Sequence, residues 1–146
     1  MLAASLKSSD QLSHFSQKYG NGLKVALQNL TAEKCDFLIN LPQNLNIQNG
    51  TKSYLLSHGS PWDLDTYIYP DTSNSILQKF LSYKEDIFFL GHTHYPMELN
   101  IQNKRIINPG SVGQQRNRRP GAHWSIFDLA TEKIDFKITP YKIDSL

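Results

Sequence analysis

The segment that decides the fold is Ile87-Phe88-Phe89-Leu90-Gly91-His92-Thr93-His94, in which four apolar residues lead directly into a Gly-His-Thr-His sequence. Four residues are too few for a helix, and an uninterrupted apolar run is typical of a strand buried on both faces of a parallel sheet. The same order recurs upstream, where Tyr54-Leu55-Leu56 is followed by Ser57-His58-Gly59. We therefore predict two neighbouring parallel strands, with their histidines at the carboxyl edge where open α/β sheets bind ligands.

These histidines form a candidate metal site. A lone histidine beside an apolar strand is more often a hydrogen-bonded structural residue, but three of the five histidines here lie in Gly-flanked loops directly after predicted strands. Histidine is the commonest metal-binding side chain. On an extended segment, residues two positions apart share a face, while Gly91 would let the backbone turn. We predict metal binding by His58, His92 and His94, and a structural or solvated role for His14 and His123.

A third loop, Asn108-Pro109-Gly110-Ser111-Val112-Gly113-Gln114-Gln115-Arg116, has the composition of an anion-binding turn. Its glycines could allow backbone N–H groups to point together at a phosphate. Five basic and no acidic side chains lie between Lys104 and Arg119. A guanidinium offers two parallel donors to phosphate oxygens. The candidate substrate-binding residues are Asn108, Gly110 and Arg116, whereas Arg118 and Arg119 are predicted to be solvated.

Three motifs, Ser-His-Gly-Ser-Pro, Gly-His-Thr-His-Tyr-Pro-Met and Asn-Pro-Gly-Ser-Val-Gly-Gln, resemble the C-terminal motifs of the calcineurin-like metallophosphoesterases, especially the small bacterial and archaeal phosphodiesterase branch. The resemblance runs from about Leu30 to Tyr141. It implies two divalent ions, manganese, zinc, iron or nickel, and hydrolysis of a phosphodiester or phosphomonoester by metal-activated water. The implied substrate is a small phosphate ester or nucleotide. The implied ligands are His58 and His92 for one metal and His94 for the other.

The sequence also departs from this family. The N-terminal motifs Asp-X-His, Gly-Asp-X-X-Asp and Gly-Asn-His are absent, and Gly20-Asn21 is followed by Gly22. The resemblance thus implies a single, N-terminally truncated domain: the C-terminal half of a four-layer α/β/β/α sandwich, a mixed sheet with flanking helices. The retained motifs assign no catalytic residue, so we expect the chain alone to be inactive, and its exposed sheet surface to favour self-association.

The pattern predicts a helical lead-in over residues 1–42 and a sheet-forming part over 43–146. In the lead-in, Thr31 caps a second helix that buries Cys35. The sheet-forming part is predicted to contain a hairpin over 45–57 with Asn49-Gly50 as its turn, a helix over 73–83, and a hairpin over 97–107. Two alternating strands with a turn at 129–132 follow, and their half-buried residues are predicted to be Trp124, Ile126, Ile134, Phe136 and Ile138.

Composition limits the function classes. The net charge of +2 gives no nucleic-acid patch, and no apolar run is long enough to span a membrane. A single cysteine excludes an intramolecular disulfide framework and makes a cytoplasmic location the expectation.

Two alternatives to a phosphoesterase stay open, and metal stoichiometry separates them. A non-catalytic protein-binding scaffold of the same fold would hold no metal, and a three-histidine zinc site with one open position would hold one.

A second open question concerns the aromatic loop that follows His58. Its side chains could form a substrate wall or pack over the core, and they are Trp62, Tyr67 and Tyr69.

Overall fold

The computed structural model describes residues 13–14, 16–17 and 20–142, and the chain divides into two compact units, residues 1–42 and 43–146. The first unit contains α3 (Gly22–Asn29) and α4 (Ala32–Ile39), and the Thr31 hydroxyl accepts a hydrogen bond from the Lys34 amide at 3.3 Å, as its capping role predicts. The prediction that Cys35 is a core residue is wrong. Neither α3 nor α4 contains a buried residue, and the Cys35 thiol is partly exposed. No helix in the described part of the chain is long and apolar enough to cross a membrane.

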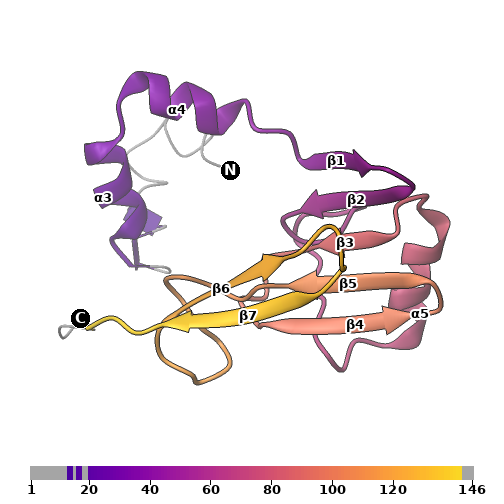
Figure 1. Ribbon diagram of the computed structural model, residues 1–146. Helices are drawn as coiled ribbons and strands as arrows, with labels where there is room; N and C mark the ends of the chain where they lie inside the picture. Colours follow the sequence, from indigo (N-terminus) through magenta and orange to yellow (C-terminus); the bar gives the residue numbers. More distant parts are fainter. Residues whose placement is uncertain (1–12, 15, 18–19, 143–146) are drawn as a thin grey trace. The chain divides into compact units, whose positions relative to one another are not determined.

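The second unit is built on a mixed five-stranded sheet of order β1-β2-β3-β5-β4, which confirms the predicted α/β class (Figure 1). Its strands are β1 (Asn44–Asn49), β2 (Lys52–Ser57), β3 (Ile87–Phe89), β4 (Met97–Ile101) and β5 (Lys104–Asn108). The central strands β2, β3 and β5 are parallel, whereas β1 and β4 pair antiparallel as the outer arms of two hairpins. The carboxyl ends of the three central strands therefore meet at one edge of the sheet.

The first hairpin forms one residue away from the predicted turn. Asn49 pairs with Lys52, so the connecting residues are Gly50 and Thr51 instead of Asn49 and Gly50. Gly50 has φ +58°. A positive φ at the first connecting residue is what a type II′ turn requires, and glycine meets it without steric cost. The glycine therefore sets the turn, and the asparagine stays in the strand.

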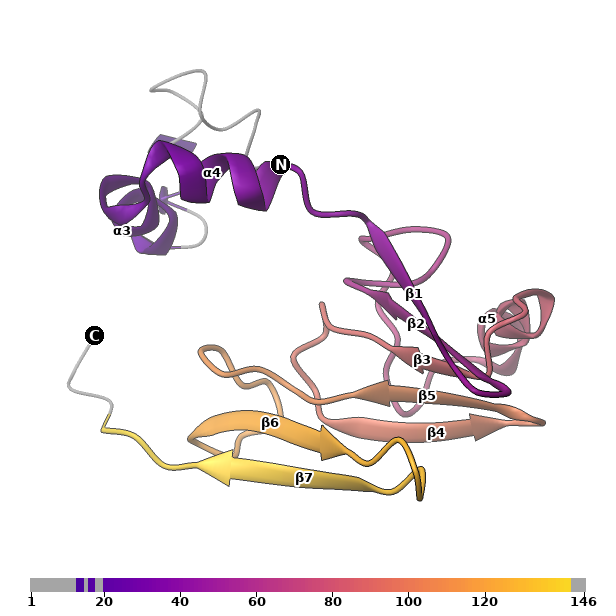
Figure 2. The ribbon, with the colours of Figure 1, turned by 45° about the horizontal axis from the view of Figure 1, so that its top comes forward.

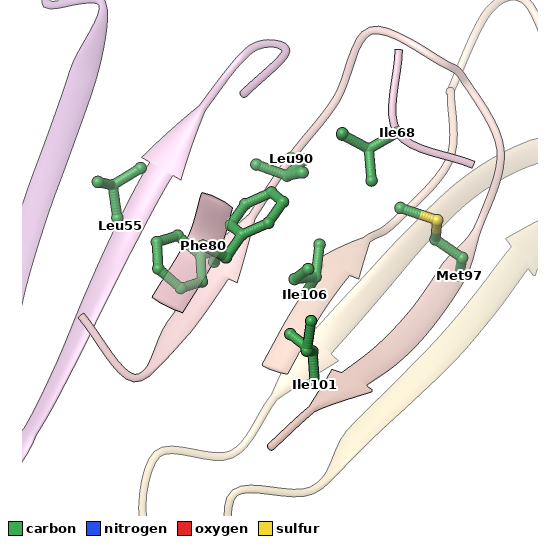
Figure 3. Close-up of a cluster of buried hydrophobic side chains, with 8 residues drawn as sticks. Leu55, Ile68, Phe80, Leu90, Met97, Ile101 and Ile106 are labelled. Carbon is green, nitrogen blue, oxygen red and sulfur yellow. The ribbon is translucent and has the colours of Figure 1, made fainter. Parts of the chain in front are cut away.

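The crossover between β2 and β3 covers one face of the sheet. It contains α5 (Asn74–Leu77) continued by the 3₁₀ turn η1 (Gln78–Ser82), at the predicted position of the helix. Phe80 from η1 is fully buried and packs among sheet residues, as Figure 3 shows. The buried members of this cluster are Leu55, Ile68, Phe80, Phe88, Leu90, Met97, Ile101 and Ile106.

The opposite face is covered by a two-stranded ribbon, β6 (Ala122–Phe127) and β7 (Ile134–Thr139) (Figure 2). Phe127 from β6 lies edge-on to Tyr54 and to Phe89, with ring centroids 6.0 and 5.2 Å apart. Ile134 joins the same cluster, which also includes Ile87 and Ile107. The unit thus has three layers: a helical segment, the five-stranded sheet and the ribbon.

The alternation predicted for β6 has the correct two-residue period, but the residues predicted to face the core face outward. Trp124 and Ile126 are 40% and 52% exposed, whereas His123 is buried and Phe127 packs on the sheet. Register explains the difference, because Trp124 and Ile126 pair with the polar residues Lys137 and Asp135 on the outer face of the ribbon. Phe127 packs between two sheet aromatics, and this contact turns the neighbouring Ile126 outward.

Replacing Phe80 with alanine tests the crossover packing. Because Phe80 is fully buried, we expect Phe80→Ala to lower the free energy of unfolding by about 3–5 kcal/mol. Phe37→Ala is the matched control, since Phe37 is 67% exposed, and it should change stability by no more than about 0.5 kcal/mol. Urea unfolding followed by circular dichroism measures both, and similar losses in the two variants would contradict this account of the core.

Candidate metal centre

The loops that follow β2 and β3 are held together by a backbone contact. The Gly91 amide donates to the His58 carbonyl at 2.8 Å. A Cβ at Gly91 would lie 3.3 Å from that carbonyl oxygen, tighter than side chains ordinarily pack, so glycine allows the close approach. Gly59 is placed under a stronger constraint, because a Cβ there would lie 2.2 Å from the Leu64 carbonyl oxygen. These two glycines bring His58 and His92 to one place.

The Gly-His-Thr-His segment is not extended, contrary to the expectation from its spacing. His92 and His94 both have left-handed backbones, with φ of 58° and 56°. The Thr93 amide donates to the Gly91 carbonyl at 2.6 Å, which closes a three-residue turn around His92. A turn of this kind with positive φ is rare and strained. Thr93, between the two histidines, is buried.

His58 and His92 form a close pair. His58 Nε2 lies 3.1 Å from His92 Nδ1, and the ring centroids are 5.0 Å apart. Two nitrogens bound to one ion at roughly 2.0–2.1 Å lie about 3.0–3.4 Å apart at ordinary ligand angles, so this spacing fits two ligands of a single metal. His92 Nε2 is buried without a hydrogen-bond partner among the described residues. The nitrogens that face each other are His58 Nε2 and His92 Nδ1, so the unpartnered His92 Nε2 is not part of this approach.

The protonation of His58 suits metal binding. Burial lowers the pKa of His58, the neighbouring His92 lowers it further, and Asp65 opposes both by raising it. The neutral imidazole that these effects favour is the form that binds a metal ion.

His94 is oriented differently from the pair. Its Nδ1 lies 2.8 Å from the backbone carbonyl oxygen of Gln114, which can only accept, so Nδ1 carries the proton. Nε2 then holds the lone pair that a metal would take, the arrangement in which a carbonyl behind a histidine fixes the tautomer of a ligand. The sequence does not indicate the Gln114 contact, because a backbone carbonyl places no requirement on the side chain at that position.

Asn108, predicted as a substrate-binding residue, ties the loops together instead of lining the cavity. It is fully buried. Its Nδ2 donates to the Gly91 carbonyl at 2.6 Å and to the Thr93 hydroxyl at 2.9 Å, and its Oδ1 accepts from the Gly110 amide at 2.9 Å. One side chain thus joins the end of β5 to the Gly-His-Thr-His turn.

The glycine amides of the Asn108–Arg116 loop are used within the loop. The Gly110 amide bonds to Asn108, and the Gly113 amide donates to the Ser111 hydroxyl at 3.4 Å. The predicted cluster of N–H groups facing an anion is therefore not formed by these two residues. Gly110 is required for another reason: its φ is +94°, and a Cβ there would lie 2.8 Å from His123 Cβ.

The three loops and the start of β6 surround a cavity of about 470 Å³. Within the described residues, however, no group of three histidine, cysteine, aspartate or glutamate side chains lies close enough to hold one ion. Of the other histidines, His14 is exposed, and His123 is buried with Nε2 2.9 Å from the Arg119 carbonyl oxygen. The residues that line the cavity are His58, Gly91, His92, His94, Pro109, Gly110, Ser111, Val112, His123, Trp124 and Ser125.

Arg116 lies next to the histidines. Its amide donates to the His94 carbonyl at 3.4 Å, and hydrogen bonds from its guanidinium to Tyr67 and then Tyr69 raise the pKa of Arg116 above its usual value. Tyr67 lies against His92, with ring centroids 4.2 Å apart. Trp62, the third aromatic residue of that loop, packs on Phe80 in the core at 4.9 Å. The aromatic loop therefore divides between the core and the site.

Comparison with known proteins identifies relatives of this arrangement. A family model of the calcineurin-like phosphoesterase superfamily domain matches residues 10–132. An uncharacterised protein of Methanocaldococcus jannaschii is 30% identical, aligned over 76% of this chain and 51% of that protein. A metallophosphoesterase from Sphaerobacter thermophilus is 26% identical with a TM-score of 0.70, covering 83% of this chain and 57% of that one. A hypothetical protein from Pyrococcus horikoshii is 24% identical with a TM-score of 0.72, covering 85% and 50%. The chain spans about half the length of these relatives.

An aspartate in place of Asn108 tests how the loops are held. Its carboxylate would face the Gly91 carbonyl oxygen, which now accepts a hydrogen bond from Nδ2. We expect Asn108→Asp to destabilise the fold by about 3 kcal/mol at pH 7, because an unpaired charge is buried, and by less at pH 4, where the acid can be protonated. Asn103→Asp, in the exposed turn between β4 and β5, is the control. Unfolding in urea at both pH values measures the difference, and equal effects at the two sites would refute the role given to Asn108.

Proposed function

The chain belongs to the calcineurin-like phosphoesterase superfamily, and we propose from this membership that the whole protein is a metal-dependent phosphoesterase. In this proposal His58 and His92 bind one divalent ion and His94 binds a second. Imidazole ligands suit manganese, iron, zinc or nickel better than magnesium or calcium. When bound, the metals would supply an activated water and neutralise charge on the phosphoryl group.

The observation that carries the proposal is the 3.1 Å approach of His58 Nε2 to His92 Nδ1, together with the different orientation of His94. The 3.1 Å spacing suits an N–H···N hydrogen bond between two neutral imidazoles and equally suits two nitrogens that bind one ion. Burial favours the neutral form of His58, which is the form that binds a metal. His94 exposes its Nε2 separately, which supports a second position.

A single zinc ion held by all three histidines is less well supported. The described residues bring no three metal-ligating side chains within reach of one ion. His58 and His92 are in contact, whereas His94 is directed by Gln114. The two-position arrangement therefore fits these contacts better than one tetrahedral site.

Asn108 and Gly110 act in this proposal by shaping the loops, and Arg116 by binding the substrate. Asn108 is buried and fixes the Gly-His-Thr-His turn, and Gly110 allows the loop to approach His123. Arg116 is exposed, and its backbone adjoins His94. Its guanidinium is suited to the oxygens of a phosphate ester beside the histidines.

Metal-dependent hydrolysis by the whole protein tests the function. With manganese, zinc or nickel we expect turnover of bis-p-nitrophenyl phosphate. The variants His92→Ala and His94→Ala should each contain less bound metal, measured by elemental analysis. In each variant kcat should fall by at least about 100-fold, because removing a ligand removes the activated water. His14→Ala, which alters an exposed histidine of the first unit, should retain both. Undiminished metal content in the His92 and His94 variants would remove the ligand assignment, and absence of metal-dependent turnover in the unaltered protein would remove the function.

Arg116 can be tested separately from the metal ligands. We expect Arg116→Ala in the whole protein to weaken vanadate binding by about 1–3 kcal/mol, the value of a lost charge-assisted hydrogen bond. Arg119→Ala is the control, because Arg119 lines a different cavity, of about 290 Å³, with Phe136 and Ile138. Titration of vanadate inhibition measures both variants. Equal weakening would point to a diffuse basic loop instead of a specific contact.

A further inference from the structure

One short segment, residues 114–116, contacts His94 at two atoms. The Gln114 carbonyl oxygen lies 2.8 Å from His94 Nδ1, and the Arg116 amide donates to the His94 carbonyl at 3.4 Å. Gln114 is exposed, so packing in a core does not hold its carbonyl in place. The position of that carbonyl, and with it the tautomer of His94, must depend on hydrogen bonds made elsewhere in the loop.

Ser111 fixes the peptide that precedes Gln114. The Ser111 hydroxyl oxygen accepts a hydrogen bond from the Gln114 amide at 3.0 Å, and a longer one from the Gly113 amide at 3.4 Å. The Ser111 carbonyl in turn accepts from the His123 amide at 3.0 Å. Because His123 belongs to β6, these bonds connect Gln114 through Ser111 to a regular strand.

The Gln115 side chain fixes the residue that follows Gln114. Its Nε2 donates to the carbonyl of Gly121, a buried residue directly before β6. The same nitrogen lies 3.3 Å from the Ser111 carbonyl oxygen and 3.1 Å from the Tyr141 hydroxyl. Carbonyl oxygens can only accept, so the nitrogen of the amide must face them. Gln115 therefore closes the loop onto the start of β6, on the other side of the Gln114 carbonyl from Ser111.

We propose that Ser111 and Gln115 are positioning residues that hold the Gln114 carbonyl against His94 Nδ1. They thereby keep the lone pair on His94 Nε2, the nitrogen assigned above to the second ion. We call Ser111, Gln114 and Gln115 the His94 support. The inference rests on the proposed function for the identity of the ion, and deepens it by naming the side chains that set the second metal position.

The tautomer of His94 in the metal-free whole protein tests the His94 support. Isotope-labelled histidine gives the tautomer from the chemical shifts of the ring nitrogens, at about pH 8, where ordinary imidazoles are neutral. The unaltered protein should show the Nδ1–H form. In Ser111→Ala and in Gln115→Ala, part of the population should shift to Nε2–H, because the Gln114 carbonyl is no longer held in place. Ser111→Thr keeps a hydroxyl and should retain the Nδ1–H form. An unchanged tautomer in both alanine variants would overturn the inference.

A double-mutant cycle tests the consequence for the metal, with manganese as the probe and calorimetric titration as the measurement. We expect Ser111→Ala to raise the Kd of the second manganese ion by roughly 10-fold, as loss of a group that orients a ligand does. In a His94→Ala background the same substitution should leave manganese binding unchanged, since it acts through His94. An equal loss in both backgrounds would show a general effect on the fold and would overturn the inference.

The matched control is Thr31→Ala. The Thr31 hydroxyl also accepts from an amide three residues later, that of Lys34 at 3.3 Å, but it does so at the start of α4. Its loss should change neither the His94 tautomer nor manganese binding. Neither measurement depends on turnover. A shifted tautomer in the alanine variants, without hydrolysis by the unaltered protein, would contradict the proposed function and keep the His94 support. Metal-dependent hydrolysis with an unchanged tautomer would do the reverse.

Discussion

The hydrogen bonds of the Asn108 side chain are the interaction on which the site depends. Parallel pairing brings the ends of β2, β3 and β5 to one edge, but the strand ladders stop there and leave three loops to be positioned. Asn108 joins the β5 end to both the Gly91 carbonyl and the Thr93 hydroxyl, and Gly91 joins the β3 end to His58. An amide can donate and accept at once, which a carboxylate or a hydroxyl of that size cannot do in the same geometry. The three loops are thereby fixed relative to one another by buried bonds.

These bonds explain how the turn can hold two strained histidines. A left-handed backbone at a residue other than glycine costs energy, and here two such residues flank Thr93. Thr93 is buried and receives a hydrogen bond from Asn108, so the turn cannot relax toward an extended form without leaving Asn108 donors unpaired. The strain is offset by satisfied hydrogen bonds directly beneath it. In return the turn presents His92 and His94 to one cavity although they do not share the face of a strand.

Sequence patterns predicted the positions of the strands and helices more accurately than they predicted which face of each strand is buried. The apolar runs Tyr54-Leu55-Leu56 and Ile87-Phe88-Phe89-Leu90 predicted the correct parallel pair, because an uninterrupted apolar run of this length is typical of a strand buried on both faces. Alternation in β6 could not reveal its inner face, since Trp124 and Ile126 are more apolar than His123 and Ser125. That choice depends on Phe127 meeting Tyr54 and Phe89, residues remote in sequence. The extended Gly-His-Thr-His segment was wrong for a similar reason, because the partner that bends it, Asn108, lies in another strand.

In the candidate site, too, features set by nearby residues were predictable, whereas features set by residues remote in sequence were not. The positions of His58, His92 and His94 after strands were enough to predict that they share a cavity. The tautomer of His94 depends on the Gln114 carbonyl, which no spacing rule connects to it. Neutral imidazoles carry no charge and a guanidinium is positive, so these side chains cannot balance the charge of the two divalent cations in the proposed function. The described residues therefore orient the histidine nitrogens, and the proposed pair of metal ions would need carboxylates in addition to these histidines.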